Sequence, residues 1–235
     1  MGRQDFTLAW EKAFNEIRIL DLGLKDYQEV WALQSKLVKK RISGEIKDIL
    51  ILVEHFPVIT LGRRGKKEEV LVSPEYLSQK KITVFRVDRG GKVTFHGPGQ
   101  LVVYPILNLT LDKRDIHWYI RSLEEAIIKS LARLGVRGEC KKGYTGVWIG
   151  EEKIASIGIG VKRWVTYHGL ALNVTTDLSY FSLINSCGLQ EKKVTSLTEV
   201  LSSKVKMDRV KTLFVNSFCE VFKRTPKLMT DFEKQ

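Results

Sequence analysis

The sequence predicts an α/β (α+β) fold in which a mixed β-sheet is flanked by helices. Three observations favour this fold. Apolar runs typical of strands are interspersed with longer helical patterns. Short turns join some neighbouring strands, so part of the sheet is antiparallel. No internal repeat and no linker rich in Pro, Gly or Ser divides the 235 residues, so we expect a single domain over residues 1–235.

Helices are predicted at three places. Asp26 can cap a helix that ends at Gly44, and Asp115 can cap a second that ends at Gly135. Apolar residues recur every three or four positions in the second helix, which is the pattern of one buried face. The same pattern over residues 210–222 predicts a C-terminal helix.

Strands are predicted from the apolar runs between these helices. The run "ILILVEH" has no polar alternation at its start and is typical of a strand buried on both faces. Tight turns are expected at Glu151-Glu152 and at Lys162–Trp164, each joining two strands as a hairpin. The predicted strands are Ile49–His55, Ile82–Asp88, Leu101–Leu109, Gly146–Gly150, Lys153–Val161 and Tyr167–Val174.

The charge balance limits the classes of partner. The chain has 39 basic and 27 acidic residues, a net charge of +12, and residues 61–235 carry the whole excess. Such a surface attracts nucleic acid, an anionic membrane or an acidic protein, or serves solubility alone, and charge does not choose among these. No apolar run approaches the roughly 18 residues needed to cross a bilayer. The N-terminus lacks the apolar core of a secretory signal, and the three cysteines are scattered, so we expect a cytoplasmic protein with free thiols.

The segment from Arg89 to Pro105 is the most unusual in the chain. Its first eleven positions hold four glycines and a proline, between two predicted strands. Glycines permit close approach of the backbone to a ligand, and Arg89, Thr94 and His96 supply a cation, a hydroxyl and a titratable ring. The segment therefore favours a binding loop over a plain turn. It has no phosphate-loop spacing, and no cysteine or histidine spacing in the chain predicts a metal site.

The three cysteines differ as candidate nucleophiles. Cys219 lies on the apolar face of the C-terminal helix and is expected to be an inert core thiol. Cys140 precedes two lysines, whereas Cys187 lies in a turn of small residues that lets a thiol approach a ligand. Composition ranks Cys187 only slightly above Cys140, and leaves open that none of the three is catalytic.

Four segments, in order, resemble the octanoyltransferases of lipoate biosynthesis, the lipoyl(octanoyl) transferase family. The segments are "VEHFPVITLGRRG", "RGGKVTFHGPGQLVVYPILNL", "GVWIGEEKIASIGIGVKRWVTYHGLALNV" and "INSCGL". The resemblance covers roughly residues 20–201. It implies the fold of the catalytic domain shared with biotin and lipoate protein ligases, a mixed sheet flanked by helices.

The resemblance also implies roles for individual residues. Cys187 corresponds to the cysteine that accepts the acyl group, and Lys153 to the lysine that lowers the pKa of that thiol. The family commonly has a proline before the cysteine, where this chain has Ser186. The residues that correspond to the substrate-binding segments are Arg89, Gly90, Gly91, Lys92, Val93, Thr94, Phe95, His96, Ser156, Ile157, Gly158, Gly169, Leu170 and Ala171.

The reaction implied by the resemblance is the first step of protein lipoylation. An octanoyl group would pass from octanoyl-acyl carrier protein to Cys187 and then to a lysine ε-amine of a lipoyl domain, with no cofactor and no metal. The implied acceptors are the lipoyl domains of 2-oxoacid dehydrogenases and the glycine cleavage H protein, and neither nucleic acid nor a membrane is an expected partner.

Further residues are assigned as hypotheses about how the substrates bind. His168 would orient the site. An apolar slot for the eight-carbon chain would be lined by Val93, Phe95, Ile157 and Leu170, and the acidic carrier protein would dock on Arg63, Arg64, Lys66 and Lys67.

Two other functions remain open at this point. An ATP-dependent lipoate or biotin protein ligase of the same fold would activate a free acid, leaving Cys187 and Lys153 without a paired role. A nucleic-acid-binding domain would use the +12 charge, but the aromatic residues do not interleave with basic ones as in a base-stacking surface.

Overall fold

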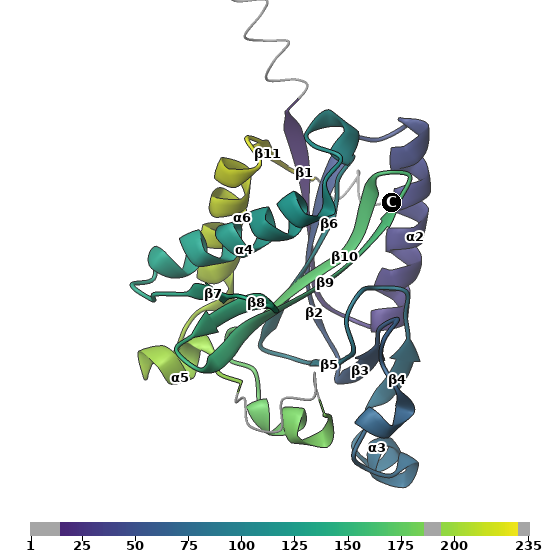
Figure 1. Ribbon diagram of the computed structural model, residues 1–235, viewed down its shortest axis with the longest axis vertical. Helices are drawn as coiled ribbons and strands as arrows, with labels where there is room; N and C mark the ends of the chain where they lie inside the picture. The colour runs from purple at the N-terminus through teal and green to yellow at the C-terminus, as the bar shows by residue number, and fades with distance from the viewer. Residues whose placement is uncertain (1–14, 186–193, 230–235) are drawn as a thin grey trace, which may run out of the picture.

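The computed structural model describes residues 15–185 and 194–229, and these form two β-sheets. The strands are β1 (Glu16–Lys25), β2 (Asp48–His55), β3 (Val58–Leu61), β4 (Thr83–Arg86), β5 (Val93–His96), β6 (Gln100–Ile106), β7 (Glu139–Lys141), β8 (Tyr144–Ile149), β9 (Glu152–Lys162), β10 (Val165–Asn173) and β11 (Thr225–Leu228). The larger sheet has the order β11-β1-β2-β6-β10-β9-β8-β7, and the smaller has the order β4-β3-β5 (Figure 1).

Both sheets are mixed, as predicted. In the larger sheet β1 is parallel to β2 and to β11, and the other neighbouring strands pair antiparallel. In the smaller sheet β3 is parallel to β4 and antiparallel to β5. The hairpins β8–β9 and β9–β10 therefore place three consecutive strands side by side.

Helices cover both faces of the larger sheet. The helices of the described residues are α2 (Tyr27–Ser43), α3 (Pro74–Gln79), α4 (Ile116–Ala132), α5 (Leu197–Leu201) and α6 (Met207–Val221), with short 3₁₀ turns η1 (Lys67–Glu69), η2 (Leu109–Leu111) and η3 (Leu178–Leu183). Of these, α3 packs against the smaller sheet through Leu77. α2 lies on one face, and α4 and α6 lie on the other (Figure 1). No helix in the described ranges is long and apolar enough to cross a membrane.

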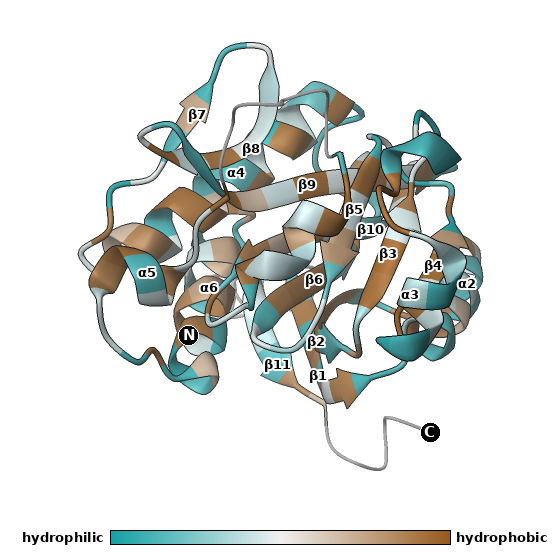
Figure 2. Ribbon diagram, turned by 90° about the horizontal axis from the view of Figure 1, so that it is seen from below, coloured by the Kyte–Doolittle hydropathy of each residue, from teal (hydrophilic) through white to brown (hydrophobic). Residues whose placement is uncertain are grey.

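The two faces of the sheet bury separate apolar cores. Leu123 and Ile127 of α4 pack with Phe214 of α6 against one face, and Val30 and Val38 of α2 pack against the other. Hydrophobic residues accordingly run along the central strands β2 and β6, and also along β3 of the smaller sheet (Figure 2). A strand buried on both faces needs the continuous apolar sequence seen in β2.

The predicted caps of α2 and the predicted start of α4 are confirmed, whereas α4 ends at Ala132 and not at Gly135, whose N–H donates to Ala132 O in the turn that follows the helix. The Asp26 side chain accepts hydrogen bonds from Gln28 N and Glu29 N, and Gly44 ends α2 with a φ of 82°. Asp115 accepts from Trp118 N at the start of α4. Short polar side chains satisfy the first free amides of a helix, and glycine adopts the left-handed conformation that ends it.

Several strand predictions differ from the structure in their bounds. The Gly-rich segment contains β5, which the sequence did not predict because its partner β3 lies more than thirty residues away. The predicted strand Leu101–Leu109 ends at Ile106, before the 3₁₀ turn η2. The β8–β9 turn is at Gly150-Glu151 rather than Glu151-Glu152, because Gly150 takes a φ of 55°.

A buried ion-pair network joins elements from three parts of the chain. Asp48, at the start of β2, accepts from Arg41 Nε of α2 at 2.8 Å and from the Asn108 amide at 3.1 Å. Its second oxygen accepts from Arg224 Nη2, just before β11, at 3.2 Å. The side chains of both arginines and of Asp48 are less than a tenth exposed.

We predict that Asp48→Ala lowers the free energy of unfolding by about 3–5 kcal/mol, because it removes the carboxylate that pairs with the buried guanidinium of Arg41 and, beside Asp112, with that of Arg224. The measurement is urea denaturation followed by circular dichroism. The control is Glu220→Ala, which removes an exposed carboxylate paired with Lys129 and Arg133 and should cost less than about 1 kcal/mol. Equal losses for the two variants would contradict the prediction.

Candidate active site

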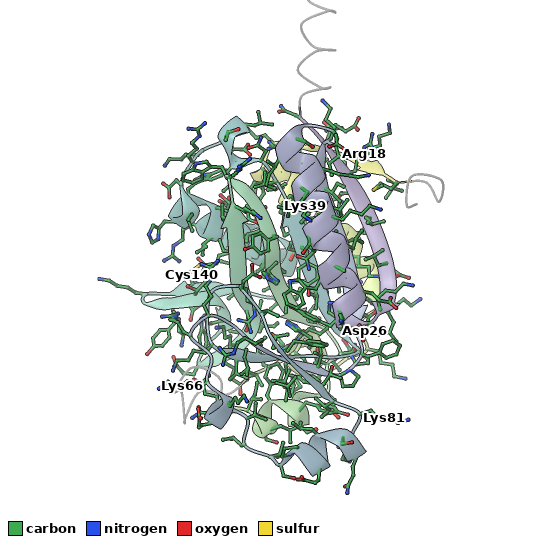
Figure 3. The ribbon with its side chains drawn as sticks, turned by 90° about the vertical axis from the view of Figure 1, so that its right-hand side faces the viewer. Arg18, Asp26, Lys39, Lys66, Lys81 and Cys140 are labelled. Carbon is green, nitrogen blue, oxygen red and sulfur yellow. The ribbon has the colours of Figure 1, made fainter. Side chains whose placement is uncertain are left out.

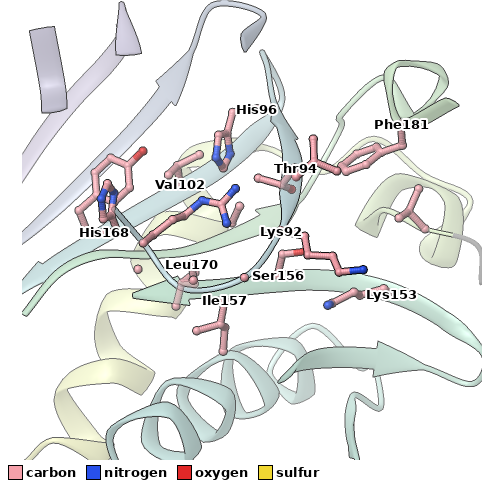
Figure 4. Close-up of a pocket in the computed structure, with 18 of the residues that line it drawn as sticks. Lys92, Thr94, His96, Val102, Lys153, Ser156, Ile157, His168, Leu170 and Phe181 are labelled. Atoms are coloured by element: carbon pink, nitrogen blue, oxygen red, sulfur yellow. The ribbon is translucent and has the colours of Figure 1, made fainter. Parts of the chain in front are cut away.

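One cavity is lined by residues from both sheets. The Gly-rich segment and β5 form one wall, β9 and β10 form another, and β6 contributes Val102 and Tyr104. Figure 4 shows Lys92 and Lys153 toward one end of this cavity and His168 at the opposite end.

Glycines allow the Gly-rich segment to lie directly on β9. Gly90 N donates to Ile159 O at 2.8 Å, outside the strand pairing of β9 with β10. A Cβ atom on Gly158 would lie 2.9 Å from Gly90 O, and one on Gly62 would lie 2.6 Å from Gly91 O. Real Cβ atoms do not approach backbone oxygens so closely. A side chain at Gly158 would push the segment away from β9, and one at Gly62 would push it away from the chain that follows β3.

Arg89 fixes this segment to the smaller sheet. Its guanidinium donates to Thr60 O and to Thr60 Oγ1, each at 2.8 Å, and to Gly90 O at 2.9 Å. The residue is only 8% exposed and lines the cavity. These hydrogen bonds hold the guanidinium in place beside the cavity.

The β9–β10 hairpin forms a closely packed floor. Gly158 pairs with Gly169, Ile157 with Leu170, and Ser156 with Ala171. A Cβ on Gly169 would lie 2.1 Å from Val103 O of β6, so only glycine fits there. This part of the cavity lining therefore combines the apolar side chains of Ile157 and Leu170 with the backbone of Gly158 and Gly169.

Lys153 begins the part of β9 that lines the cavity. Its Nζ lies over the ring of Trp148, its cross-strand partner on β8, at 5.2 Å from the ring centroid. The backbone of Lys153 bridges to Val194 and accepts from Thr195 N at 3.0 Å. Val194 also lines the cavity, so the chain that follows residues 186–193 joins the site beside Lys153.

Two buried histidines near the cavity are held neutral. His96 Nδ1 lies 2.8 Å from Gln100 Oε1, and burial together with His55 lowers the pKa of His96 to about 3. His55 Nε2 lies 2.9 Å from the Tyr104 hydroxyl, and burial lowers its pKa to about 4. At neutral pH both rings therefore serve as hydrogen-bonding groups and not as cations.

His168 closes the opposite end of the cavity from Lys153. Its Nε2 lies 2.9 Å from Asp88 Oδ1, and the Tyr167 hydroxyl donates to the other carboxylate oxygen at 2.6 Å. The pKa of His168 is lowered, chiefly by burial, although the hydrogen bond and charge of Asp88 act in the opposite direction. The hydrogen bonds from His168 and Tyr167 hold the pKa of Asp88 well below its usual range.

The two cysteines that the structure describes are poor nucleophiles. Burial and Glu124 raise the pKa of Cys140, whose Sγ lies 3.4 Å from a Glu124 oxygen. Burial raises the pKa of Cys219 to about 11. Neither residue lines the cavity. Cys187 and Ser186 lie outside the described residues, whose nearest members are Asn185, bonded to Glu69 O at 2.7 Å, and Val194.

The structure brings most of the sequence-predicted site residues to this one cavity. Lys153 and twelve of the fourteen predicted substrate-binding residues line it, and Gly90 and Phe95 do not. Phe95 points into a separate core cluster, where it stacks on Tyr180 with ring centroids 4.6 Å apart. It is therefore not a wall of this cavity, whereas Val93, Ile157 and Leu170 are.

Six lining residues were not predicted as site residues. They are Tyr27, Val102, Tyr104, Trp148, Phe181 and Val194. In the sequence these six residues look like ordinary core residues. Their place at the cavity becomes visible only when distant segments are brought together in the fold. Within the described ranges, no group of three or more His, Cys, Asp or Glu is placed to bind a metal.

We predict that the buried histidines destabilise the protein in mild acid. Because the folded pKa values of His55 and His96 lie below the unfolded value of 6.5, the unfolded chain binds protons first as the pH falls. The free energy of unfolding should drop between pH 6.5 and about 4, by up to about 1.4 kcal/mol per pH unit for each ring. Urea titrations at several pH values measure it. His96→Gln should flatten the dependence, and an unchanged slope in that variant would contradict the assignment.

Comparison with known proteins identifies the family. Residues 26–219 match the model of the lipoyl protein ligase A/B catalytic domain. The octanoyltransferase of Thermoanaerobacter sp. strain X514 is 47% identical over 204 residues, covering 87% of this chain and 89% of the relative. The octanoyltransferase of Caldanaerobacter subterraneus subsp. tengcongensis is 48% identical over 205 residues, covering 87% and 89%.

A solved structure confirms the predicted fold. The putative lipoate protein ligase Ta0514 of T. acidophilum, with bound lipoic acid, superposes with a TM-score of 0.71 at 21% identity, covering 93% of this chain and 92% of that one. With both its sequence relatives and its family model agreeing over most of its length, this chain belongs to the lipoyl protein ligase A/B catalytic-domain family and, within it, to the octanoyltransferases.

Proposed function

We propose that this protein is an acyltransferase that moves an octanoyl group from the thioester of an acidic acyl carrier protein to a lysine ε-amine of a lipoyl domain, through a thioester on Cys187. The main support is the identity of nearly half of the aligned residues with octanoyltransferases over 87% of the chain. Lys153 and the segments that correspond to the family's substrate-binding residues also line one cavity.

The chemistry of the first step suits a thiolate beside an ammonium. The Cys187 thiolate attacks the thioester carbonyl, a new carbon–sulfur bond forms, and the carrier thiolate leaves and takes up a proton. An ordinary cysteine has a pKa of about 8.5, and a nearby Lys153 ammonium favours its ionised form. One thioester replaces another, so no ATP is consumed.

In the second step the neutral lysine amine of the acceptor attacks the Cys187 thioester. An amide bond forms, the Cys187 thiolate leaves, and the amine loses its proton to a base. Lys153 is proposed to pass that proton on, alternating between its charged and neutral forms. Backbone N–H groups of the glycine-rich cavity wall are proposed to stabilise the oxyanion of each step.

Cys140 and Cys219, the two cysteines that the structure describes, are unsuited to be the nucleophile, and this favours Cys187. The raised pKa values of Cys140 and Cys219 leave little thiolate on either at neutral pH. The described chain on each side of Cys187 lies close to the cavity, with Phe181 and Val194 among its lining residues. These observations support Cys187 as the proposed nucleophile.

The acyl-enzyme provides a direct test. After incubation with octanoyl-acyl carrier protein, intact-protein mass spectrometry should show one hydroxylamine-labile octanoyl adduct on the wild type and on Cys140→Ala, and none on Cys187→Ala. Lys153→Ala should form the adduct about tenfold more slowly or worse, since each unit of thiol pKa changes the thiolate fraction about tenfold. An adduct on Cys140, or ATP-dependent use of free octanoate without the carrier, would overturn the proposal.

The carrier protein is proposed to dock on the basic segment at residues 63–67. Arg63, Arg64, Lys66 and Lys67 are all exposed. Figure 3 shows Lys66 toward the end of the molecule that carries the smaller sheet. Arg64 N donates to Gly91 O at 3.1 Å, so this segment borders the cavity wall directly. An acidic partner attracted there would deliver its thioester to the cavity rim.

We predict that the double variant Arg64→Glu/Lys66→Glu raises the KM for octanoyl-carrier protein several-fold at low salt. Arg63 is left unchanged because it interacts with Tyr167 beside Asp88. The matched control reverses Lys36 and Lys39, which are exposed on α2, and should leave the KM unchanged. The effect should shrink in 0.5 M salt, since screening weakens interactions between exposed charges. Equal effects of the two double variants would show that no specific docking surface exists here.

A further inference from the structure

Glu124 is a fully buried carboxylate on the core-facing side of α4. It is 0% exposed, although the same face of the helix carries Leu123 and Ile127. Its Oε2 accepts from Arg121 Nη1 at 2.6 Å, and its Oε1 accepts from the backbone amide of Gly146 at 2.9 Å. A buried charge is costly unless it is well paired, so these contacts need an explanation beyond helix packing.

The amide that Glu124 binds lies at an irregular point of the β8–β9 pairing. The register shifts between Val147 and Trp148, and Gly146 has a φ of 118°, which L side chains rarely adopt. The extra residue of this irregularity is Ile154 of β9, and Gly146 precedes Val147, the first residue of β8 that pairs in register with β9. The N–H of Gly146 therefore lies outside the ladder, and Glu124 supplies its acceptor.

Gly146 in turn forms the wall against which the Lys153 side chain lies. A Cβ on Gly146 would be 2.7 Å from Lys153 Cε and 2.4 Å from Ala155 O. The backbone at Gly146 therefore approaches the lysine stem more closely than any side chain would allow. On the same strand, Trp148 presents its ring to Lys153 Nζ.

We propose that Glu124 is a positioning residue for Lys153, acting through the Gly146 amide. The carboxylate holds the Gly146 backbone in the position that confines the lysine stem between Gly146 and the Trp148 ring, and so fixes the direction of the ammonium. Glu124 does not line the cavity, so its effect on the reaction passes through Lys153. This inference rests on the proposed role of Lys153 in lowering the pKa of the Cys187 thiol.

Five variants distinguish this positioning role from a purely structural one. Glu124→Ala removes the acceptor, and Glu124→Gln keeps an oxygen for the Gly146 amide while losing the charge. Arg121→Ala removes the charged partner, whose side chain is 60% exposed, and Cys140→Ala removes the neighbouring thiol. Glu124→Asp withdraws the carboxylate by one methylene and serves if Glu124→Ala does not fold.

The measurement is the pH dependence of Cys187 alkylation by iodoacetamide, read on the Cys187 peptide by mass spectrometry, in the Lys153 and Lys153→Ala backgrounds. With Lys153 present, we expect Glu124→Ala to raise the thiol pKa toward the Lys153→Ala value. It should also slow octanoyl transfer about tenfold at pH 7. Glu124→Gln, Arg121→Ala and Cys140→Ala should stay near the wild type. In the Lys153→Ala background, Glu124→Ala should cause no further rise.

The outcomes separate failure of the inference from failure of the proposed function. If Lys153→Ala raises the thiol pKa but Glu124→Ala and Glu124→Asp do not, the positioning role is wrong and the proposed function stands. A rise that is equal in both backgrounds also contradicts the role, because Glu124 would then act without Lys153. If Lys153→Ala itself leaves the thiol pKa unchanged, the proposed lysine–cysteine pairing fails, and the inference fails with it.

Discussion

The site depends on backbone lying directly against backbone. Residues 89–91 rest on β9 through the hydrogen bond from Gly90 N to Ile159 O, and the packing leaves no room for a Cβ at Gly62 or Gly158. This contact joins the smaller sheet to the larger one and forms the cavity between them. Arg89 then fixes the segment by bonding to Thr60 of β3. The glycines therefore permit the contact between residues 89–91 and β9, in addition to shaping a local turn.

Charge is distributed unevenly around this cavity. Burial keeps His55 and His96 neutral, so they contribute hydrogen bonds without repelling a nearby cation. The cationic side chains that line the cavity are Arg89, Lys92 and Lys153, and the two lysines lie at the opposite end from His168 (Figure 4). An acyl chain along the apolar walls of the cavity would carry its carbonyl end toward the lysines, where an anionic thiolate is also best stabilised.

The sequence predicted the features that depend on contacts between residues close together in the chain, and it missed those that depend on residues far apart in the chain. Asp26 and Asp115 cap their helices through contacts within three residues, and the repeat of apolar residues in α4 is equally local, so these predictions were accurate. The strand β5 and the lining residue Tyr27 depend on pairings across tens of residues, which no local pattern shows. The residue roles came from the family resemblance, because a lysine after a hairpin turn is ordinarily a solvated side chain. Glu124 gave a local signal, a carboxylate on an apolar helical face, but its partner at Gly146 is visible only in the folded chain.

The fold by itself does not select among the reactions of this family. The superposed lipoate protein ligase shares the mixed sheet at only 21% identity, and a common architecture supports different ways of activating an acid. What distinguishes a thioester-exchanging enzyme is a nucleophile with a lowered pKa, which needs a cation held in a fixed direction and not merely nearby. A lysine stem has several rotatable bonds, so its ammonium is directed only if its surroundings restrict them. In this chain the restriction comes from a positive-φ glycine and an indole ring on β8, which makes the β8–β9 bulge as relevant to the chemistry as the cavity walls themselves.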